Sequence, residues 1–133
     1  MASYSQKSVL KPVKAFNIAT INSNTTANGI AIDAQGFEAL TFLFEVGART
    51  DGTFNIDIKE SDDNITFSSV SDDFLVGTKS LMTINSANTI KSIGYVGKKR
   101  YARLDVISTL IASTGATVSA TAILGEPLIA PSN

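Results

Sequence analysis

The sequence predicts an all-β protein, a single two-sheet β-sandwich of jelly-roll-like topology with an extended arm at each end. Three observations predict this class. Apolar and polar residues alternate with the two-residue period of a strand in most segments. Clusters of Gly, Asn, Asp and Ser interrupt these segments at short spacing, and no segment sustains the 3.6-residue period of an amphipathic helix. Roughly eight or nine strands at this spacing are typical of a sandwich.

The first three expected strands lie before the first strong turn pair. The first covers residues 13–21 and is followed by a polar loop. The second, at 29–33, is short and directs Ile30 and Ile32 into the core. The third, at 40–46, alternates most cleanly, so one of its faces must be buried. The residues expected on that face are Leu40, Phe42, Phe44 and Val46.

The strands in the middle of the chain are separated by acidic and glycine-containing turns. Asp51 and Gly52 form a turn pair, and residues 54–58 alternate again after it. We expect the strands at 40–46 and 54–58 to pair as an antiparallel hairpin. Short strands between turns are expected over the following residues, up to 96. The residues of the second hairpin strand expected in the core are Phe54, Ile56 and Ile58.

The last two expected strands cover residues 101–108 and 117–124, with a turn between them. We expect these two strands to form a pair that completes the sheet. The first should present Tyr101, Arg103 and Asp105 to solvent or to a partner. The inward rows of the two strands are expected to be Ala102, Leu104 and Val106, and Val118, Ala120, Ala122 and Leu124.

The chain of 133 residues has the usual size of one domain, so we expect a single domain over residues 1–133. Its ends fall outside the alternating strands. We expect an N-terminal arm at 1–12 and a C-terminal tail at 125–133, where glycine and prolines end regular structure. Both should contribute more to attachment than to folding. Within the tail, the apolar Leu128 and Ile129 are candidate partner contacts.

Composition excludes several function classes. The formal net charge is −1 and charged residues make up 17%, below the roughly 25% of an average domain, which argues against nucleic-acid binding and favours association with another protein. His and Cys are absent, which excludes disulfides, thiolate or imidazole metal sites and catalysis that needs either residue. No apolar run of membrane-spanning length and no secretory signal occurs, so we expect synthesis in a cytoplasm and no membrane association.

Two acidic pairs, Asp62 with Asp63 and Asp72 with Asp73, are the carboxylate clusters that could indicate chemistry or a calcium site. Both pairs fall in expected turns. Aspartate is favoured there because its side chain accepts hydrogen bonds from nearby backbone N–H groups. The turn interpretation is preferred, and the sequence predicts no catalytic, metal-binding or cofactor-binding residue.

The basic run Lys98-Lys99-Arg100 is the candidate contact surface within the sandwich. It is flanked by two tyrosines, and Arg103 follows in the next strand. Three basic residues at the start of a strand are also compatible with an ordinary solvated loop. The candidate contact residues here are Tyr95, Lys98, Lys99, Arg100, Tyr101 and Arg103.

Several motifs together resemble small head-associated proteins of tailed bacteriophages. They are Asp51-Gly52-Thr53-Phe54, the stretch 58–63 with Thr66-Phe67, the stretch 93–103, and 123–127, so the resemblance spans roughly residues 40 to 130. It implies a capsid decoration or cement protein on the capsid exterior of a virion, made in the bacterial host cytoplasm and without a catalytic role. The implied partners are the major capsid protein and other copies of the chain. A homotrimer is expected, because heterologous contacts that close a ring suit a three-fold site.

Two alternatives remain open. A tail or baseplate structural protein is the nearest variant of the phage interpretation. The stretch 60–67 also resembles a motif of galactose-binding-type jelly-rolls, which implies a carbohydrate-binding module that recognises a surface glycan. In this chain Phe67 stands where those modules commonly have Trp, which weakens the case for sugar binding but leaves the fold unaffected.

Overall fold

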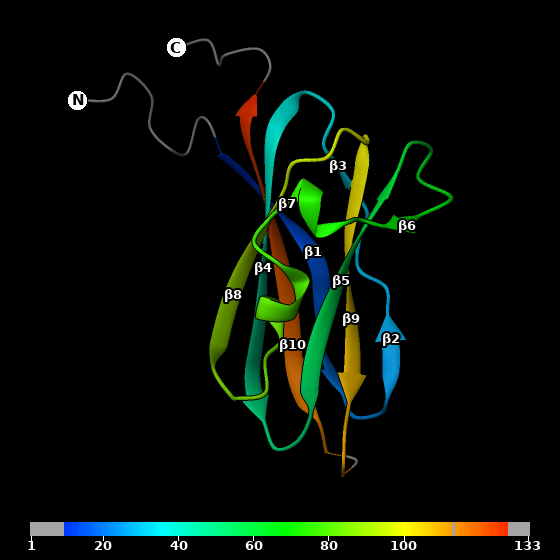
Figure 1. The fold of residues 1–133 in the computed structure, drawn as a ribbon. Helices are drawn as coiled ribbons and strands as arrows, with labels where there is room; N and C mark the ends of the chain where they lie inside the picture. Colours follow the sequence, from blue (N-terminus) through cyan, green and yellow to red (C-terminus); the bar gives the residue numbers. More distant parts are fainter. Residues whose placement is uncertain (1–9, 113, 128–133) are drawn as a thin grey trace, which may run out of the picture.

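The computed structural model describes residues 10–112 and 114–127, which form two antiparallel five-stranded sheets packed face to face (Figure 1). The predicted all-β sandwich is confirmed. Sheet A contains, in spatial order, β1 (Leu10–Ile21), β10 (Ala116–Pro127), β4 (Phe37–Arg49), β8 (Thr89–Tyr95) and β7 (Leu75–Val76). Sheet B contains β2 (Thr25–Ala27), β9 (Tyr101–Thr109), β5 (Thr53–Ser61) and β6 (Ser68–Ser69), with β3 (Ile32–Asp33) also paired to β9. Two 3-10 helices, η1 (Asp72–Phe74) and η2 (Lys79–Met82), lie between β6 and β8 in the chain.

The core lies between the two sheets and is built from the inward rows that alternation predicts. Over residues 40–46 of β4 and 54–58 of β5, every second residue is buried while the intervening residues reach the surface. This follows from the pleat, because successive side chains of a strand point to opposite faces. The predicted inward residues that are buried are Ile32, Leu40, Phe42, Phe44, Val46, Phe54, Ile56, Ile58, Ala102, Leu104, Val106, Val118, Ala120, Ala122 and Leu124. Ile30 differs from the prediction and is 38% exposed.

The predicted strand pairings are wrong, although strands form at five of the six predicted places and the predicted strand at 29–33 is reduced to β3. β4 pairs with β10 and β8 in sheet A, whereas β5 pairs with β9 and β6 in sheet B. The turn at Asp51 and Gly52 therefore carries the chain from one sheet to the other, with Gly52 at a φ of 116°. β9 and β10 also belong to different sheets. Alternation specifies which face of a strand is buried, but both sheets bury a face in the same core, so it does not specify the neighbour.

The inner ends of the two predicted arms are strand residues. In the β1–β10 pair, Leu10 lies opposite Gly125 and Pro12 opposite Ile123. Residues 10–12 and 125–127 are thus part of sheet A. The remaining arm residues, 1–9 and 128–133, lie outside the described residues.

One side of the sandwich is closed by the chain between β2 and β3. The backbone N–H of Ile30 donates to the carbonyl oxygen of Ala15 in β1 at 2.8 Å. The N–H of the preceding residue, Gly29, donates to the Asp105 carboxylate in β9 at 3.0 Å. A Cβ on Gly29 would overlap the carbonyl oxygen of Leu104 and would lie 2.7 Å from that of Ala15. Glycine is required here because backbone from both sheets approaches it.

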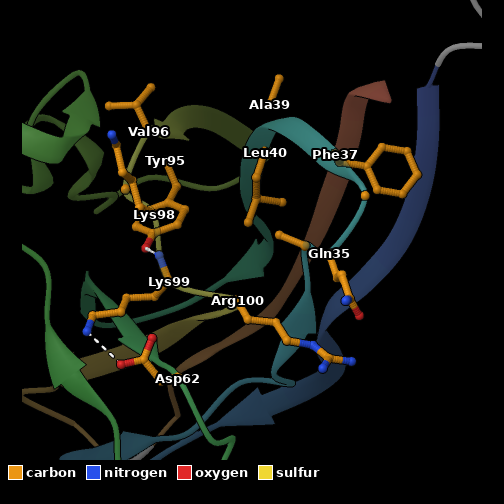
Figure 2. Close-up of a pocket in the computed structure, with 13 residues that line it drawn as sticks. Gln35, Phe37, Ala39, Leu40, Asp62, Tyr95, Val96, Lys98, Lys99 and Arg100 are labelled. Atoms are coloured by element: carbon orange, nitrogen blue, oxygen red, sulfur yellow. Dashed lines mark hydrogen bonds and ion pairs between the residues drawn. The ribbon is translucent and has the colours of Figure 1, made fainter. Parts of the chain in front are cut away.

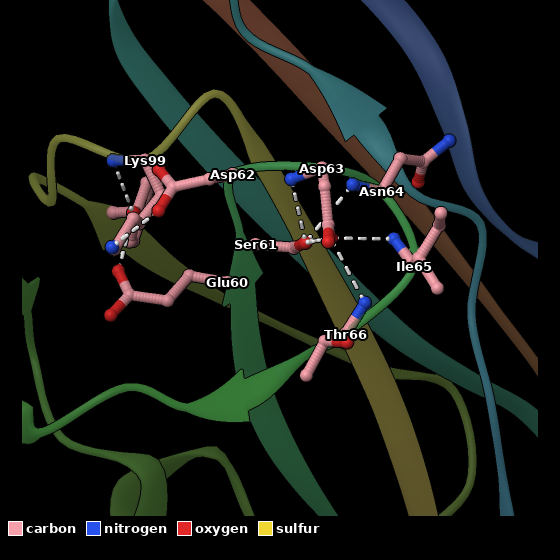
Figure 3. Close-up of polar contacts among 9 residues, drawn as sticks. Glu60, Ser61, Asp62, Asp63, Asn64, Ile65, Thr66 and Lys99 are labelled. Carbon is pink, nitrogen blue, oxygen red and sulfur yellow. Dashed lines mark hydrogen bonds and ion pairs between the residues drawn. The ribbon is translucent and has the colours of Figure 1, made fainter.

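The first acidic pair lies in a turn, as predicted, at the end of β5 (Figure 3). The Asp63 carboxylate accepts backbone N–H bonds from Thr66 at 3.0 Å and Ile65 at 2.9 Å, and a hydroxyl bond from Ser61 at 2.8 Å. These three bonds, in that order of importance, lower the pKa of Asp63 to about 2. Ser61 in turn accepts the N–H groups of Asp63 and Asn64. The turn is therefore held by its own polar side chains.

We expect Asp63→Ala to lower the melting temperature at pH 7 and to reduce the loss of stability in acid. The pKa of Asp63 falls from 3.8 to about 2 on folding, so its carboxylate stabilises the folded state above about pH 4, and this contribution is lost as the pH falls through 2. Thermal melts by circular dichroism at pH 7, 4 and 2 measure the effect. Asp63→Asn, which keeps an acceptor, should melt between the two. If the melting temperatures of the native protein and of Asp63→Ala fell equally between pH 7 and pH 2, this stabilising role of the Asp63 carboxylate would be wrong.

The second acidic pair is also in a turn, at the start of η1. The hydroxyl of Ser71 accepts the N–H of Asp73 at 3.3 Å and caps the helix.

In the described part of the chain, no three Asp or Glu side chains gather where they could hold a metal ion. Across the same residues, no helix is long and apolar enough to cross a membrane.

Candidate functional site

Three adjacent hollows surround Val96 at the end of the sandwich where β4 begins and β8 ends. Figure 2 shows the residues that line one of them. Their volumes are about 600, 370 and 300 Å³, and Val96 lines all three. We call the region the Val96 surface. It is defined by Phe37, Ala39, Phe74, Val76, Val96 and Lys98.

Strand pairing at the edge of sheet A fixes the apolar part of the Val96 surface. β7 pairs with the end of β8, and beyond it the N–H of Val96 donates to the carbonyl oxygen of Phe74 at 2.8 Å. The intervening pair, Leu75 and Tyr95, points into the core, so its neighbours on either side point outward. Phe74, Val76 and Val96 are 51%, 65% and 52% exposed. Three large apolar side chains therefore face solvent on hydrogen-bonded backbone.

The basic run lies at the rim of this surface, and two of its charges are paired. Lys99 contacts Asp62 at 2.7 Å, and Arg100 contacts Asp33 at 2.8 Å. The hydrogen bond that Lys99 donates to Asp62 raises the pKa of Lys99, and the bond that Arg100 donates to Asp33 lowers the pKa of Asp33. Lys98 takes part in none of the ion pairs found among the described residues. The charges of Lys99 and Arg100 therefore hold their own loop in place, and the run adds little unpaired positive charge to the surface.

The prediction that Tyr95 is an exposed contact residue is wrong. Its side chain is 3% exposed and points inward from β8. The phenol donates to a carboxylate oxygen of Glu60 at 2.7 Å and accepts the N–H of Lys99 at 3.2 Å. Burial, and after it the bond to Glu60, raises the pKa of Tyr95 above its usual value. A Cβ on Gly97 would overlap the Tyr95 ring, so glycine there lets the loop fold over the phenol.

The other predicted contact residues are not brought into the hollows. Tyr101 is half-buried, with the Arg100 guanidinium 5.0 Å from its ring. Arg103 lies over the Phe67 ring at 4.3 Å and pairs with the buried Asp105 at 2.8 Å. The predicted tail contacts, Leu128 and Ile129, lie outside the described residues.

Sheet A also presents an outer face with few charges. Strand register aligns its outward residues in rows that cross the sheet. Lys14 and Glu45 are the charged side chains in these rows, and the rest are aliphatic, hydroxyl-bearing, glycine or proline. We call this the sheet A outer face. Its rows are Val76-Gly94-Thr41-Ile123-Pro12, then Ser92-Leu43-Thr121-Lys14, and then Ile90-Glu45-Ser119.

The outer face of sheet B differs, because ion pairs cover it. Lys59 lies 3.3 Å from Asp105, and Lys79 lies 2.8 Å from Asp57. The prediction that Asp105 faces solvent or a partner is wrong, because Asp105 is fully buried beneath Lys59 and Arg103, which pair with its carboxylate. Most of these charges are already satisfied within the chain. The two faces of the sandwich are therefore chemically distinct.

Sequence reasoning missed the apolar residues of the Val96 surface. Phe74 and Val76 flank the inward Leu75, in a segment too short to show a period. The exposure of Val96 could have been predicted from the sequence. Ile93 and Tyr95 are in phase with a buried row, and Val96 is out of phase with it. An apolar residue out of phase beside a glycine-containing loop marks the exposed apolar surface here, whereas the basic run marks only its rim.

Comparisons with known proteins identify the fold. No family model and no curated protein matches the chain. Among solved structures, the PBSX exported protein XepA is similar over 92% of this chain and 40% of its own, with 14% identity and a TM-score of 0.58. This chain thus spans less than half of that protein. The SPBc2 prophage-derived protein YomS is 17% identical over 86% of this chain and 91% of its own, with a TM-score of 0.40. A Bacillus endospore appendage protein is 13% identical over 90% and 89%, with a TM-score of 0.42.

The class defined by the fold is an all-β sandwich shared with the PBSX exported protein XepA. At 14% identity, the likeness to XepA extends to the fold alone.

Proposed function

We propose that this chain is a structural protein of a tailed-phage particle, a decoration protein that binds the outside of the head. Its partner is the major capsid protein, and it acts by binding without catalysis. The observation that carries the proposal is the sheet A outer face, which is extended, sparsely charged and uncovered in the described residues. The motif resemblance over residues 40–130 and the fold shared with a phage-derived protein support it.

The chemistry of the sheet A outer face suits a protein partner. The centre of a protein interface is depleted of charge, because each buried charge must be desolvated or paired. In the middle row, Leu43 and Thr121 offer apolar and hydroxyl groups side by side, with Lys14 at the edge. The opposite charges of Lys14 and Glu45 lie in different rows and would orient a partner without burying an unpaired ion at the centre.

The decisive experiment is the composition of purified particles. Mass spectrometry should find the chain in stoichiometric amounts, and cryo-electron microscopy should place it on the head exterior. Density on the tail or baseplate would favour that alternative instead. Absence from particles, or only a few copies, would overturn the proposal.

Thr121→Glu should weaken binding to heads that lack the protein by about tenfold or more, because it places an unpaired carboxylate in the middle of the sheet A outer face. Thr121 is exposed, so the melting temperature should change little. The matched control is Thr26→Glu, on an exposed strand position of sheet B. Pull-down of decorated heads measures both variants. Equal binding by both would exclude the sheet A outer face as the attachment surface.

The structure weighs against the carbohydrate alternative at its most specific residue. Phe67 replaces the expected Trp, and one face of its ring is occupied by the Arg103 guanidinium at 4.3 Å. A sugar would have to displace this contact to stack there. Binding on a glycan array would support the alternative.

A further inference from the structure

The Val96 surface and the C-terminal segment of the chain are complementary, and we propose that residues 128–133 of one copy bind the Val96 surface of a second copy. The segment reads Leu-Ile-Ala-Pro-Ser-Asn. Its role would be to join copies of the chain to one another. This self-association does not require a phage head and is therefore independent of the function proposed above.

The acceptor is a preformed apolar surface. Phe74, Val76 and Val96 are each more than half exposed, and the hollows beside them provide space for further apolar side chains. The backbone bond between Val96 and Phe74, and the anchoring of the buried Tyr95 to Glu60, hold the surface in place. A surface ordered before binding loses little conformational entropy when a partner docks.

The donor is a short apolar stretch bounded by prolines. Leu128, Ile129 and Ala130 follow Pro127 and precede Pro131, with no charged residue among them. Proline disfavours helical conformation in the residue before it, which suits docking of this stretch in an extended form. Six extended residues span about 20 Å. An extended apolar segment of this length matches an open surface better than a closed cavity.

The position of the segment favours a second copy over its own chain. Pro127 lies opposite Phe37, which lines the largest hollow, so the segment begins at the same end of the sandwich as the Val96 surface. Figure 1 shows β10 running out of that end. To reach Val96 in its own chain, the segment would have to reverse and cross β4 without a glycine. A neighbouring copy requires no reversal.

The contact joins two different surfaces, so it is heterologous. Such contacts build closed rings when the rotation between copies permits. A ring of three copies is the arrangement expected for the oligomer. Each copy would then donate one segment and accept another.

The test uses three proteins: the full chain, the chain ending at Pro127, and the full chain with Val96→Lys. In sedimentation velocity over a micromolar series, the full chain should associate and each variant alone should remain monomeric. Mixing the two variants should restore a one-to-one dimer, because V96K still donates its segment and the truncated chain still offers an intact surface. Loss of each docked apolar side chain should weaken association about tenfold or more.

The controls separate this contact from the alternatives. Ile111→Lys, a fully exposed residue at the opposite end of the sandwich, should associate like the full chain. Unchanged association of the truncated chain would overturn the proposal, as would a mixture of variants that stays monomeric. A monomeric full chain whose melting temperature falls on truncation would mean that the segment docks on its own sandwich. If self-association behaves as expected and the chain is absent from particles, only the proposed function is wrong.

Discussion

Replacing Phe44 with alanine should lower the free energy of unfolding by about 3–5 kcal/mol. Phe44 is fully buried in β4, between strands β10 and β8, so truncation removes a large apolar contact area and leaves a cavity that the surrounding sheet cannot fill. Domains of this size are stable by only about 5–15 kcal/mol, so the variant should be close to unfolding at 37 °C. Urea denaturation followed by circular dichroism measures the change.

Phe74→Ala is the matched control for Phe44→Ala. Phe74 is half exposed on the Val96 surface, so its truncation should cost less than about 1 kcal/mol. If the two substitutions lowered the free energy of unfolding by similar amounts, Phe44 would not lie in the core.

Gly29→Ala should destabilise the protein by more than about 3 kcal/mol, although it adds only a methyl group. The new Cβ would overlap the Leu104 carbonyl oxygen and crowd that of Ala15, and neither backbone can move without disturbing its own sheet. The N–H bond from Gly29 to Asp105 would also be strained, which would leave a buried carboxylate short of a donor.

Gly47→Ala is the control for Gly29→Ala. A Cβ on Gly47 has its nearest neighbour, the Thr117 carbonyl oxygen, at an ordinary 3.8 Å, so the change should stay within about 0.5 kcal/mol. Chemical denaturation of both variants decides the point. A stable Gly29→Ala protein would show that the chain between β2 and β3 does not lock the two sheets together.

The faces of the strands were predictable from sequence, whereas their partners were not. Alternation over 40–46 and 54–58 correctly placed both inward rows, since side-chain direction is a local property of a strand. Pairing depends on the whole chain. β4 has as its neighbour β10, which follows it by roughly seventy residues, and the intervening turn at Gly52 leads to the other sheet. No local pattern encodes that choice.

The candidate surface was predictable only in outline. The sequence predicted a contact surface at the loop 98–100, and this loop does border the hollows. It could not show that Asp62 and Asp33 neutralise Lys99 and Arg100, because these partners come from distant segments. Composition predicted a charge-poor protein, but not that the outward rows of sheet A carry few charges while ion pairs lie on the outer face of sheet B. That asymmetry appears only when strand register aligns the outward residues of each sheet.

The place of β10 in the middle of sheet A affects how the protein is made. β10 is the last described strand in the chain, yet it lies between β1 and β4. A nascent chain therefore cannot complete this sheet until residue 127 has left the ribosome. Until then, β1 and β4 each have an edge without its β10 partner. Pairing Leu10 with Gly125 closes almost the whole described chain, which makes folding slow and leaves those edges exposed to other nascent chains. Chains truncated before residue 116 should accumulate as insoluble aggregates, and slower synthesis at low temperature should improve the yield of soluble full-length protein.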